Sequence, residues 1–330
     1  MIITRTPYRI SFFGGGTDHP LWYNQNGGAV LSASINKYCY ITCRFLPPFF
    51  KHKHRIVYSQ QENVNHINEI DHPSVRESIR YAKIKEGLEI HHDGDLPSMS
   101  GLGSSSSFTV GLLHALYGLK GKVKNKQQLA LDAIHVEQNL IKENVGSQDQ
   151  TIAAFGGFNK IEFGKNNKIL VDPLTISTRR LNDFQEHLLL FFSDFSRKSS
   201  EIEAEKLKKF RDKSKELHAM TAMVQEGIDI LKNRRDLNDF GKLLNEGWKL
   251  KRGLASVVST DKIDNIYETG IKAGAIGGKL LGAGGGGFML FFASPERHKK
   301  IKEKLNKFLN VPFRIEYSGS KIIYNSPQKI

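Results

Sequence analysis

Residues 97–119 read PSMSGLGSSSSFTVGLLHALYGL, and this stretch says more about the fold than any other part of the chain. The strand-like segment LEIHH (88–92) precedes it, and the apolar periodicity after the serines predicts a helix. Glycines let the backbone approach a ligand closely, and the first amides of a helix have no partner within the helix. Such amides, together with the helix dipole, bind phosphate. The stretch therefore predicts a phosphate site, with a flexible loop and a serine N-cap as the structural alternative.

A second glycine-rich segment, GAGGGG at residues 282–287, formally satisfies the dinucleotide fingerprint GxGxxG. That fingerprint follows a strand and opens a helix. Here a helical stretch comes first and the strand-like FMLFFA (288–293) follows, so the order is wrong. The P-loop pattern GxxxxGK[ST] does not occur either. We interpret these glycines as a close approach of the backbone to a ligand or to another segment, or as a plain turn.

The third segment, TPYRISFFGGGTDHP, spans residues 6–20. It places Arg9 on a predicted strand and Asp18 just past a turn of three glycines. Taken alone, an arginine or an aspartate at the end of a strand is usually structural.

Length and periodicity indicate an α+β protein with two domains. The chain has 330 residues, of which 39% are hydrophobic and 25% charged, as in ordinary globular proteins. The first half alternates strands, among them 29–35 and 38–46, with helices such as 125–144. The second half contains a long helical stretch at 200–232. Composition changes near residues 172–185, where we expect the domain boundary, with a cleft between the domains.

The formal net charge of +14 indicates an acidic partner, which could be nucleic acid, an anionic membrane or a phosphorylated small molecule. Basic clusters such as KLKKFRDK (206–213) are mixed with acids and predict solvated helix faces. No segment reaches the roughly 20 apolar residues of a membrane helix, and the N-terminus lacks the pattern of a signal peptide. We therefore expect a cytoplasmic protein. Cys39 and Cys43 share a strand face but lie too far apart to bridge, so we expect them to be packing residues.

Together, PYRISFFGGGTD (7–18), PSMSGLGSSSS (97–107) and GGKLLGAGGGGF (277–288) resemble, in this order, the three motifs of the GHMP kinases. The family is named for galactokinase, homoserine kinase, mevalonate kinase and phosphomevalonate kinase. The resemblance implies the two-domain GHMP kinase fold and the use of ATP and Mg²⁺. The N-terminal domain, residues 1–178, would be similar to domain 2 of ribosomal protein S5 and bind ATP. The C-terminal domain, residues 179–330, would be ferredoxin-like.

The resemblance also implies roles for individual residues. The ATP phosphates would lie on Ser100, Gly101, Leu102, Gly103, Ser104, Ser105 and Ser106. Mg²⁺ would be held by Ser105 and Glu137, and catalysis would depend on Asp149 as base and Arg9 beside it. The acceptor would contact Gly15, Gly16, Thr17, Asp18, Gly284 and Gly285.

These residue types suit phosphoryl transfer, which is catalysed mostly by positioning and by neutralising charge on the transferred group. Backbone amides, Mg²⁺ and Arg9 would supply the positive field. A carboxylate at Asp149 would abstract the proton of the acceptor hydroxyl or orient that hydroxyl.

The first motif departs from the galactokinase pattern, because residues 14–18 read GGGTD where galactokinase-like members have Gly-Glu-His-Thr-Asp. This variant resembles the D-glycero-D-manno-heptose 7-phosphate kinases and, more distantly, the fucokinases. It implies phosphorylation of the anomeric hydroxyl of heptose 7-phosphate to heptose 1,7-bisphosphate, a step toward nucleotide-activated heptose for surface polysaccharide. The basic residues that could bind the substrate phosphate are Arg197, Lys198, Lys249, Lys251 and Arg252.

Three alternatives remain open. A fucokinase or another anomeric sugar kinase would act on a sugar without a phosphate. A nucleic-acid-binding module, suggested by the charge, would bind with a steep dependence on salt and have no kinase activity. A non-catalytic sugar sensor could share the scaffold, although the presence of Ser105, Glu137 and Asp149 argues against it. We expect ATP and a sugar phosphate as partners, and neither nucleic acid nor a membrane.

Overall fold

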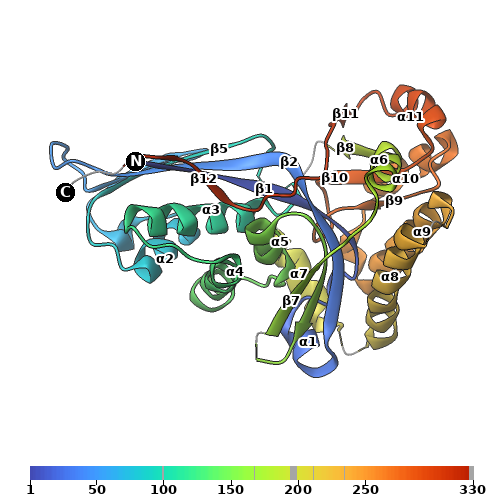
Figure 1. Ribbon diagram of the computed structural model, residues 1–330, viewed down its shortest axis with the longest axis horizontal. Helices are drawn as coiled ribbons and strands as arrows, with labels where there is room; N and C mark the ends of the chain where they lie inside the picture. The colour runs from blue at the N-terminus through green and yellow to red at the C-terminus, as the bar shows by residue number, and fades with distance from the viewer. Residues whose placement is uncertain (99, 167, 194–198, 211, 234, 327–330) are drawn as a thin grey trace.

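The computed structural model describes residues 1–98, 100–166, 168–193, 199–210, 212–233 and 235–326. Two β-sheets organise these residues, and helices pack against both of them (Figure 1). The larger sheet and its helices form one end of an elongated molecule, and the smaller sheet and its helices form the other. The predicted α+β class with two domains is confirmed.

The larger sheet has eight strands in the order β12-β1-β2-β5-β3-β4, with β6 pairing with β2 and β7 with β6. Its strands are β1 (Ile2–Phe13), β2 (Gly28–Phe45), β3 (His54–Val57), β4 (Gln61–Val64), β5 (Leu88–Gly94), β6 (Phe158–Gly164), β7 (Lys168–Pro173) and β12 (Lys321–Asn325). The two strands predicted at 29–35 and 38–46 form the single strand β2. They are continuous because β1 pairs with both halves, while β6 pairs with the first half and β5 with the second.

Helix α3 (Ser104–Leu119) lies against β1 and β2. It is buried on nearly all sides, because the sheet covers one side and other helices cover the rest. These neighbours are α2 (Pro73–Ala82), α4 (Lys126–His135) and α5 (Gln148–Phe155). The helix predicted at 125–144 is α4 followed by a π-helical turn at Val136–Ile141. Widened turns of this kind often occur at functional sites.

The smaller sheet has the strand order β11-β8-β10-β9. Its strands are β8 (Leu188–Phe192), β9 (Gly277–Leu280), β10 (Phe288–Phe292) and β11 (Leu309–Asn310). The helices of this part are α6 (Thr178–Glu186), α7 (Ser199–Lys208), α8 (Ser214–Lys232), α9 (Leu237–Leu254), α10 (Asp261–Ala273) and α11 (His298–Lys304). The helix predicted at 200–232 is two helices, α7 and α8, and the short helix α1 (Pro20–Asn26) joins β1 to β2.

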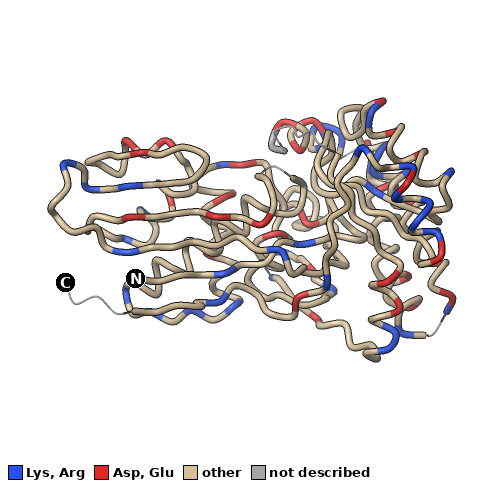
Figure 2. Tube along the Cα trace, turned by 90° about the horizontal axis from the view of Figure 1, so that it is seen from above, with Lys and Arg blue, Asp and Glu red and all other residues tan. Residues whose placement is uncertain are grey.

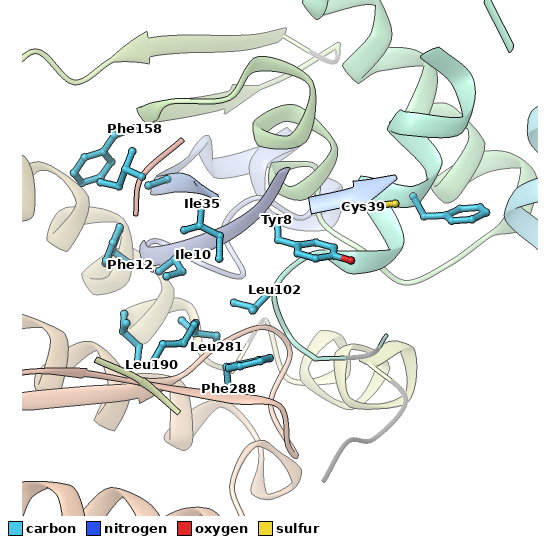
Figure 3. Packing of buried hydrophobic residues seen from close by; sticks show 14 of the residues in the cluster. Tyr8, Ile10, Phe12, Ile35, Cys39, Leu102, Phe158, Leu190, Leu281 and Phe288 are labelled. Carbon is cyan, nitrogen blue, oxygen red and sulfur yellow. The ribbon is translucent and has the colours of Figure 1, made fainter. Parts of the chain in front are cut away.

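One large hydrophobic cluster extends through both parts of the molecule. Ile10 and Phe12 of β1 belong to the same buried cluster as Leu102, Leu281 and Phe288 (Figure 3). Each fully buried side chain of this size stabilises the folded state by roughly 1.5–3 kcal/mol. The packing therefore fixes how the loop before α3 sits on the smaller sheet.

The C-terminal segment returns to the first sheet. Strand β12 pairs antiparallel with β1, with Ile2 opposite Asn325. The expected division into 1–178 and 179–330 assigns this strand to the second domain, whereas it lies in the sheet of the first. Pairing with β12 gives the first residues of β1 a hydrogen-bonded neighbour on the side away from β2, where an open edge would favour aggregation.

The structure shows where the cysteines and the charged residues lie and whether a described helix could cross a membrane. Cys39 and Cys43 are buried free thiols, which confirms that they are packing residues. In the part of the chain that the structure describes, no helix has both the length and the apolar character needed to cross a membrane. Lys and Arg are distributed over both parts, with Asp and Glu among them (Figure 2).

Candidate active site

A cavity of ≈ 270 Å³ lies where the two parts of the molecule meet. The end of β1, the glycine turn after it, the start of α3 and the start of α5 form one wall. Helices α7 and α9, strand β9 and the residues just after β9 form the other. Residues of all three glycine-rich segments therefore meet at one place.

Arg9 and Asp149 form an ion pair at this cavity. Nε and Nη2 of Arg9 on β1 donate to Oδ1 and Oδ2 of Asp149 in the first turn of α5, at 2.7 and 2.6 Å. Nη1 of Arg9 donates to the carbonyl oxygen of Gly101 at 2.7 Å, which ties the pair to the loop before α3. The side chain of Arg9 is 6% exposed and that of Asp149 24%. The carboxylate is thus the accessible partner, and each of its oxygens keeps a second lone pair for a ligand.

The start of α3 has the properties of an anion site. Its N-cap is Gly103, with φ +75°, a left-handed conformation that glycine adopts at little cost and that provides no capping side chain. The first helical hydrogen bond runs from the amide of Ser107 to the carbonyl oxygen of Gly103, at 2.9 Å. The amides of Ser104, Ser105 and Ser106 precede it, so they have no acceptor within the helix. All three serines line the cavity.

The glycine-rich segment after β9 supports the loop before α3. The amide of Phe288 donates to the carbonyl oxygen of Ser100 at 3.2 Å. A Cβ at Gly282 would lie 2.5 Å from Cα of Gly101, and a Cβ at Gly287 would lie 2.2 Å from the oxygen of Ser100. The two backbones are therefore in direct contact, which only glycine permits. This contact explains why glycines recur here without a dinucleotide fold.

A Gly282→Ala variant is expected to move this loop. Its φ of +70° costs about 1–2 kcal/mol with a Cβ present, and the clash with Gly101 adds about 1–3 kcal/mol. We expect a loss of about 2–5 kcal/mol in the free energy of unfolding. The affinity for ATP should fall at least about tenfold, because the amides of α3 shift. Urea unfolding and titration with a nucleotide analogue would measure both.

The matched control is Gly121→Ala. Gly121 has a similar φ of +64°, but a Cβ there would meet nothing within 4 Å. The Gly121→Ala variant should therefore lose only the free energy of unfolding that comes from the left-handed backbone conformation, about 1–2 kcal/mol. Its affinity for ATP should stay unchanged. Equal losses in the two variants would contradict a supporting role of the glycine contact.

Glu137 is a buried carboxylate beneath the serines. Its Oε2 accepts hydrogen bonds from Oγ of Ser106 at 2.9 Å and from Nε2 of Gln150 at 2.5 Å, whereas Oε1 has no partner among the described residues. Burial raises the pKa of Glu137 to about 7, and the carboxylate of Glu143 adds to the shift. A buried carboxylate oxygen without a donor, next to a hydroxyl, suits a hard cation such as Mg²⁺. The serine that contacts Glu137 is Ser106, whereas Ser105, expected to hold Mg²⁺ together with Glu137, is exposed and lies about 100° away around the helix.

Asp18 is fixed at the end of the first glycine turn. Its Oδ1 accepts from the amide of Gly16 at 2.9 Å and its Oδ2 from the amide of Gln148 at 3.3 Å. Burial, reinforced by the carboxylate of Asp149, raises the pKa of Asp18 to about 6. A Cβ at Gly146 would lie 1.9 Å from Oδ2 of Asp18, so glycine is required there. Asp18 is oriented before any ligand binds and can accept hydrogen bonds from hydroxyl groups.

Three buried lysines line the cavity from the second part of the molecule. They are Lys206 on α7, Lys251 on α9 and Lys279 on β9, with exposed fractions of 4%, 7% and 7%. Of the three, only Lys251 is among the residues that the sequence predicts to bind the substrate phosphate. Lys206 belongs to a mixed-charge helix that was interpreted as solvated. Lys279 lies within GGKLLGAGGGGF (277–288), one of the three segments that resemble family motifs, and this position is a signal that points to it.

Most of the predicted site residues line the cavity, namely Arg9, Gly15, Gly16, Asp18, Gly101, Gly103, Ser104, Ser105, Ser106 and Asp149. The others are buried and do not line it, namely Thr17, Ser100, Leu102, Glu137, Gly284 and Gly285. Leu102 is apolar and packs into the core. Oγ1 of Thr17 donates to two backbone carbonyls, and the amide of Gly285 donates to the carbonyl of Val258. Instead of Gly284 and Gly285, it is Gly282 and Ala283 that line the cavity.

The five candidates for binding a substrate phosphate have different positions. Lys251 lines the cavity. Lys249 is exposed and does not line it, and Arg252 pairs with Asp264 at 2.7 Å. Arg197 and Lys198 lie outside the described residues.

The chain matches two protein-family models. Residues 73–157 match the GHMP kinases N terminal domain, and residues 200–311 match the GHMP kinases C terminal domain. A D-glycero-alpha-D-manno-heptose 7-phosphate kinase of Campylobacter jejuni is 31% identical over 319 residues, which cover 93% of each chain.

Two further similarities are more distant. A bifunctional fucokinase/GDP-fucose pyrophosphorylase of Arabidopsis thaliana is 23% identical over 329 residues, covering 91% of this chain and 31% of that longer protein. The crystal structure of a D-glycero-D-manno-heptose 1-phosphate kinase from Bacteroides thetaiotaomicron superposes with a TM-score of 0.80. It is 24% identical and covers 98% of this chain and 100% of its own, which supports the two-domain fold.

Proposed function

Because this chain belongs to the GHMP kinases, we propose that it transfers the γ-phosphoryl group of ATP to the anomeric hydroxyl of D-glycero-D-manno-heptose 7-phosphate. Proteins of this family are phosphotransferases that act on hydroxyl groups, and this chain is one of them. The proposed product is heptose 1,7-bisphosphate, for the synthesis of nucleotide-activated heptose and surface polysaccharide.

The proposal depends on one observation: the free amides at the start of α3 and the carboxylate of Asp149 line the same cavity. The open amides at the start of α3 can bind the phosphates of ATP, and the carboxylate of Asp149 lies on the same cavity, held by Arg9. Holding donor and acceptor in line supplies much of the catalysis of phosphoryl transfer. The buried guanidinium of Arg9 adds positive charge close to the transferred group.

In the proposed reaction, the anomeric oxygen of the acceptor forms a bond to the γ-phosphorus. The bond between that phosphorus and the β–γ bridging oxygen breaks, and ADP leaves with the electron pair. The proton of the hydroxyl passes to a free lone pair of Asp149 and is later lost to solvent. Asp18 accepts hydrogen bonds from other hydroxyls of the sugar and so sets its orientation.

We propose that Mg²⁺ is held by Glu137 together with Ser105 or Ser106. The orphaned Oε1 of Glu137 and the hydroxyl of Ser106 beside it support this assignment. When bound, Mg²⁺ neutralises negative charge on the phosphates of ATP. The protein contributes the position of these oxygens beneath the first turn of α3.

Two observations favour a phosphorylated heptose as acceptor. The relative of Campylobacter jejuni, 31% identical over nearly the whole chain, is a heptose 7-phosphate kinase. In this chain the first motif has glycines at residues 14–16, which leave space and bare amides in the pocket. We place the reaction in the cytoplasm, since the buried free thiols Cys39 and Cys43 are typical of a reducing compartment.

The second candidate is a kinase for the anomeric hydroxyl of an unphosphorylated sugar such as fucose. It is favoured by the similarity to the fucokinase of Arabidopsis thaliana over 91% of this chain.

A coupled assay of ADP release separates the two candidates. The panel would contain D-glycero-D-manno-heptose with and without the 7-phosphate, fucose, galactose, and mannose with and without a 6-phosphate. We expect kcat/KM for heptose 7-phosphate to exceed that for free heptose at least about 100-fold, because a site built around a polar group rejects analogues that lack it. Equal turnover of free heptose or fucose would refute the proposal and favour the second candidate.

A further inference from the structure

The two walls of the cavity carry opposite charge. Among the described residues, the wall of the larger sheet and its helices has one cation, Arg9, and three carboxylates, Asp18, Glu143 and Asp149. The wall of the smaller sheet and its helices has one carboxylate, Glu203, and three ammonium groups, those of Lys206, Lys251 and Lys279. His19 also lines the cavity, and burial lowers its pKa to about 4, so it is neutral at pH 7. A ligand that fills the cavity meets acceptors on one side and cations on the other.

Two of the lysines are held by backbone carbonyls. Lys279 donates to two carbonyl oxygens near the end of β1 at 2.9 and 2.7 Å. Lys251 donates to two carbonyl oxygens of residues 277–288 at 2.8 and 2.5 Å. An ammonium group has three N–H donors, so each lysine keeps one for a ligand. No carboxylate pairs with either lysine within the part of the chain that the structure describes.

The third lysine belongs to a pair at the same cavity. Nζ of Lys206 donates to Oε1 of Glu203 at 2.5 Å, one turn earlier on α7. This leaves two N–H donors of Lys206 for a ligand. The pair brings one cation and one anion, so Lys251 and Lys279 remain as the surplus positive charge of this wall.

The ammonium groups of Lys206, Lys251 and Lys279 destabilise the folded protein when no anion is bound, because they are buried and repel one another. Burial, together with the positive charges of Arg9 and Lys206, lowers the pKa of Lys279 to about 7. Burial also lowers the pKa of Lys251, and the neighbouring Lys279 is the next cause. A bound anion would favour the charged form of both lysines and relieve their mutual repulsion.

We propose that Lys206, Lys251 and Lys279 bind the phosphate that the acceptor sugar already carries, while Asp18 and Asp149 on the opposite wall take its hydroxyl groups. The inference rests on the proposed function and specifies its substrate class as a sugar with a phosphate monoester. The phosphates of ATP have a separate anion site in the amides that open α3, on the other wall. A phosphate dianion is matched by the two unpaired ammonium groups, Lys251 and Lys279.

The test is a Lys206→Met variant assayed with heptose 7-phosphate and with free heptose. Lys206 is chosen because the hydrogen bond of its Nζ runs to a side chain and not to a backbone carbonyl, so its replacement keeps the carbonyl contacts made by Lys251 and Lys279. We expect the ratio of kcat/KM for the phosphorylated over the free sugar to fall at least about 30-fold, while the KM for ATP stays within about threefold. Orthophosphate should inhibit the wild type competitively with heptose 7-phosphate, and its Ki should rise at least about tenfold in the variant.

Lys249→Met is the matched control, because Lys249 is exposed on the same helix as Lys251 and does not line the cavity. In this variant, the ratio of kcat/KM for heptose 7-phosphate over free heptose should equal that of the wild type. The Ki of orthophosphate should also be unchanged. Lys279→Gln provides a second variant with the same expected loss as Lys206→Met.

The possible outcomes separate the inference from the proposed function. If the wild type prefers heptose 7-phosphate but the lysine variants keep the ratio, the inference is overturned and the function stands. If the variants raise the KM for ATP and keep the ratio, these lysines bind the nucleotide and the inference is overturned. If the wild type prefers a different phosphorylated sugar and the variants lose that preference, the inference is supported and the proposed sugar is wrong.

Discussion

Replacing Asp149 by asparagine is expected to lower kcat by about 10³-fold, the usual contribution of a positioned general base. Asparagine keeps the size of the side chain and one hydrogen-bond acceptor, but it cannot take the proton of the acceptor hydroxyl. The KM for ATP should stay within about threefold, because the amides of α3 do not depend on this carboxylate. Steady-state kinetics with heptose 7-phosphate would measure both values.

Comparison with Asp149→Ala separates proton transfer from orientation. If the carboxylate only orients the acceptor, asparagine should retain most of the activity and alanine should lose it. If it takes the proton, both variants should be almost equally poor. Asp172→Asn, an exposed aspartate on β7, is the control and should match the wild type. A kcat of Asp149→Asn within about threefold of the wild type would remove Asp149 from the chemistry.

Both variants also leave Arg9 without its anion. Its side chain is 6% exposed, and removing one partner of a buried pair costs about 3–5 kcal/mol when the remaining charge has no other acceptor. The carbonyl oxygen of Gly101 remains as an acceptor, and asparagine adds another, so the loss should be smaller for Asp149→Asn than for Asp149→Ala. Circular dichroism and thermal unfolding must therefore accompany the kinetics, at a temperature where both variants are folded.

The second large effect is expected for Glu137→Gln, which should lower kcat at least about 100-fold and weaken the dependence of the rate on Mg²⁺. Glutamine fits the same space and can accept the hydrogen bond from Ser106, but it has no charge for a cation. Titration of the rate with Mg²⁺ at saturating ATP would measure the change. An unchanged Mg²⁺ dependence would exclude Glu137 as a ligand.

The same substitution should change stability in the opposite direction. The pKa of Glu137 is raised from 4.5 to about 7 in the folded protein, so between these values the folded state binds more protons than the unfolded state. The free energy of unfolding of the wild type therefore falls as the pH rises through this window. Glutamine does not titrate, and its stability relative to the wild type should increase by about 2–3 kcal/mol from pH 5 to pH 8.

Urea unfolding of both proteins in the presence of a chelator, at pH 5 and at pH 8, would measure this difference. The neighbouring Glu143 is present in both proteins, so its own titration largely cancels in the comparison. A difference that does not change with pH would show that Glu137 ionises in the folded protein as easily as in the unfolded one.

Motifs in the sequence were sufficient to predict that Arg9 and Asp149 lie side by side. Arg9 and Asp149 are 140 residues apart, yet the resemblance of their segments to family motifs placed them together, and they form a bidentate pair. Motifs succeed here because a phosphate loop requires glycines and a helix start at fixed spacing, and this requirement is local.

Sequence patterns could not say what each side chain of a motif contacts. Ser106, and not Ser105, contacts Glu137, because rotation around the axis of α3 turns one side chain inward and the other outward. Leu102 and Thr17 lie within motifs but serve the core and the backbone. These outcomes depend on how α3 and the glycine turn pack on the rest of the molecule.

The sequence by itself determined the α+β class, most helices and strands, and the glycine-rich loop that opens α3, because these follow from periodicity and from short segments with strict backbone demands. Only the tertiary structure decided that β12 returns to the first sheet, and that Lys206, Lys251 and Lys279 share one wall of the cavity. The three lysines come from two helices and a strand spread over 74 residues, and no local pattern relates them to one another. Their common position results from the packing of α7, α9 and β9, which no single segment encodes.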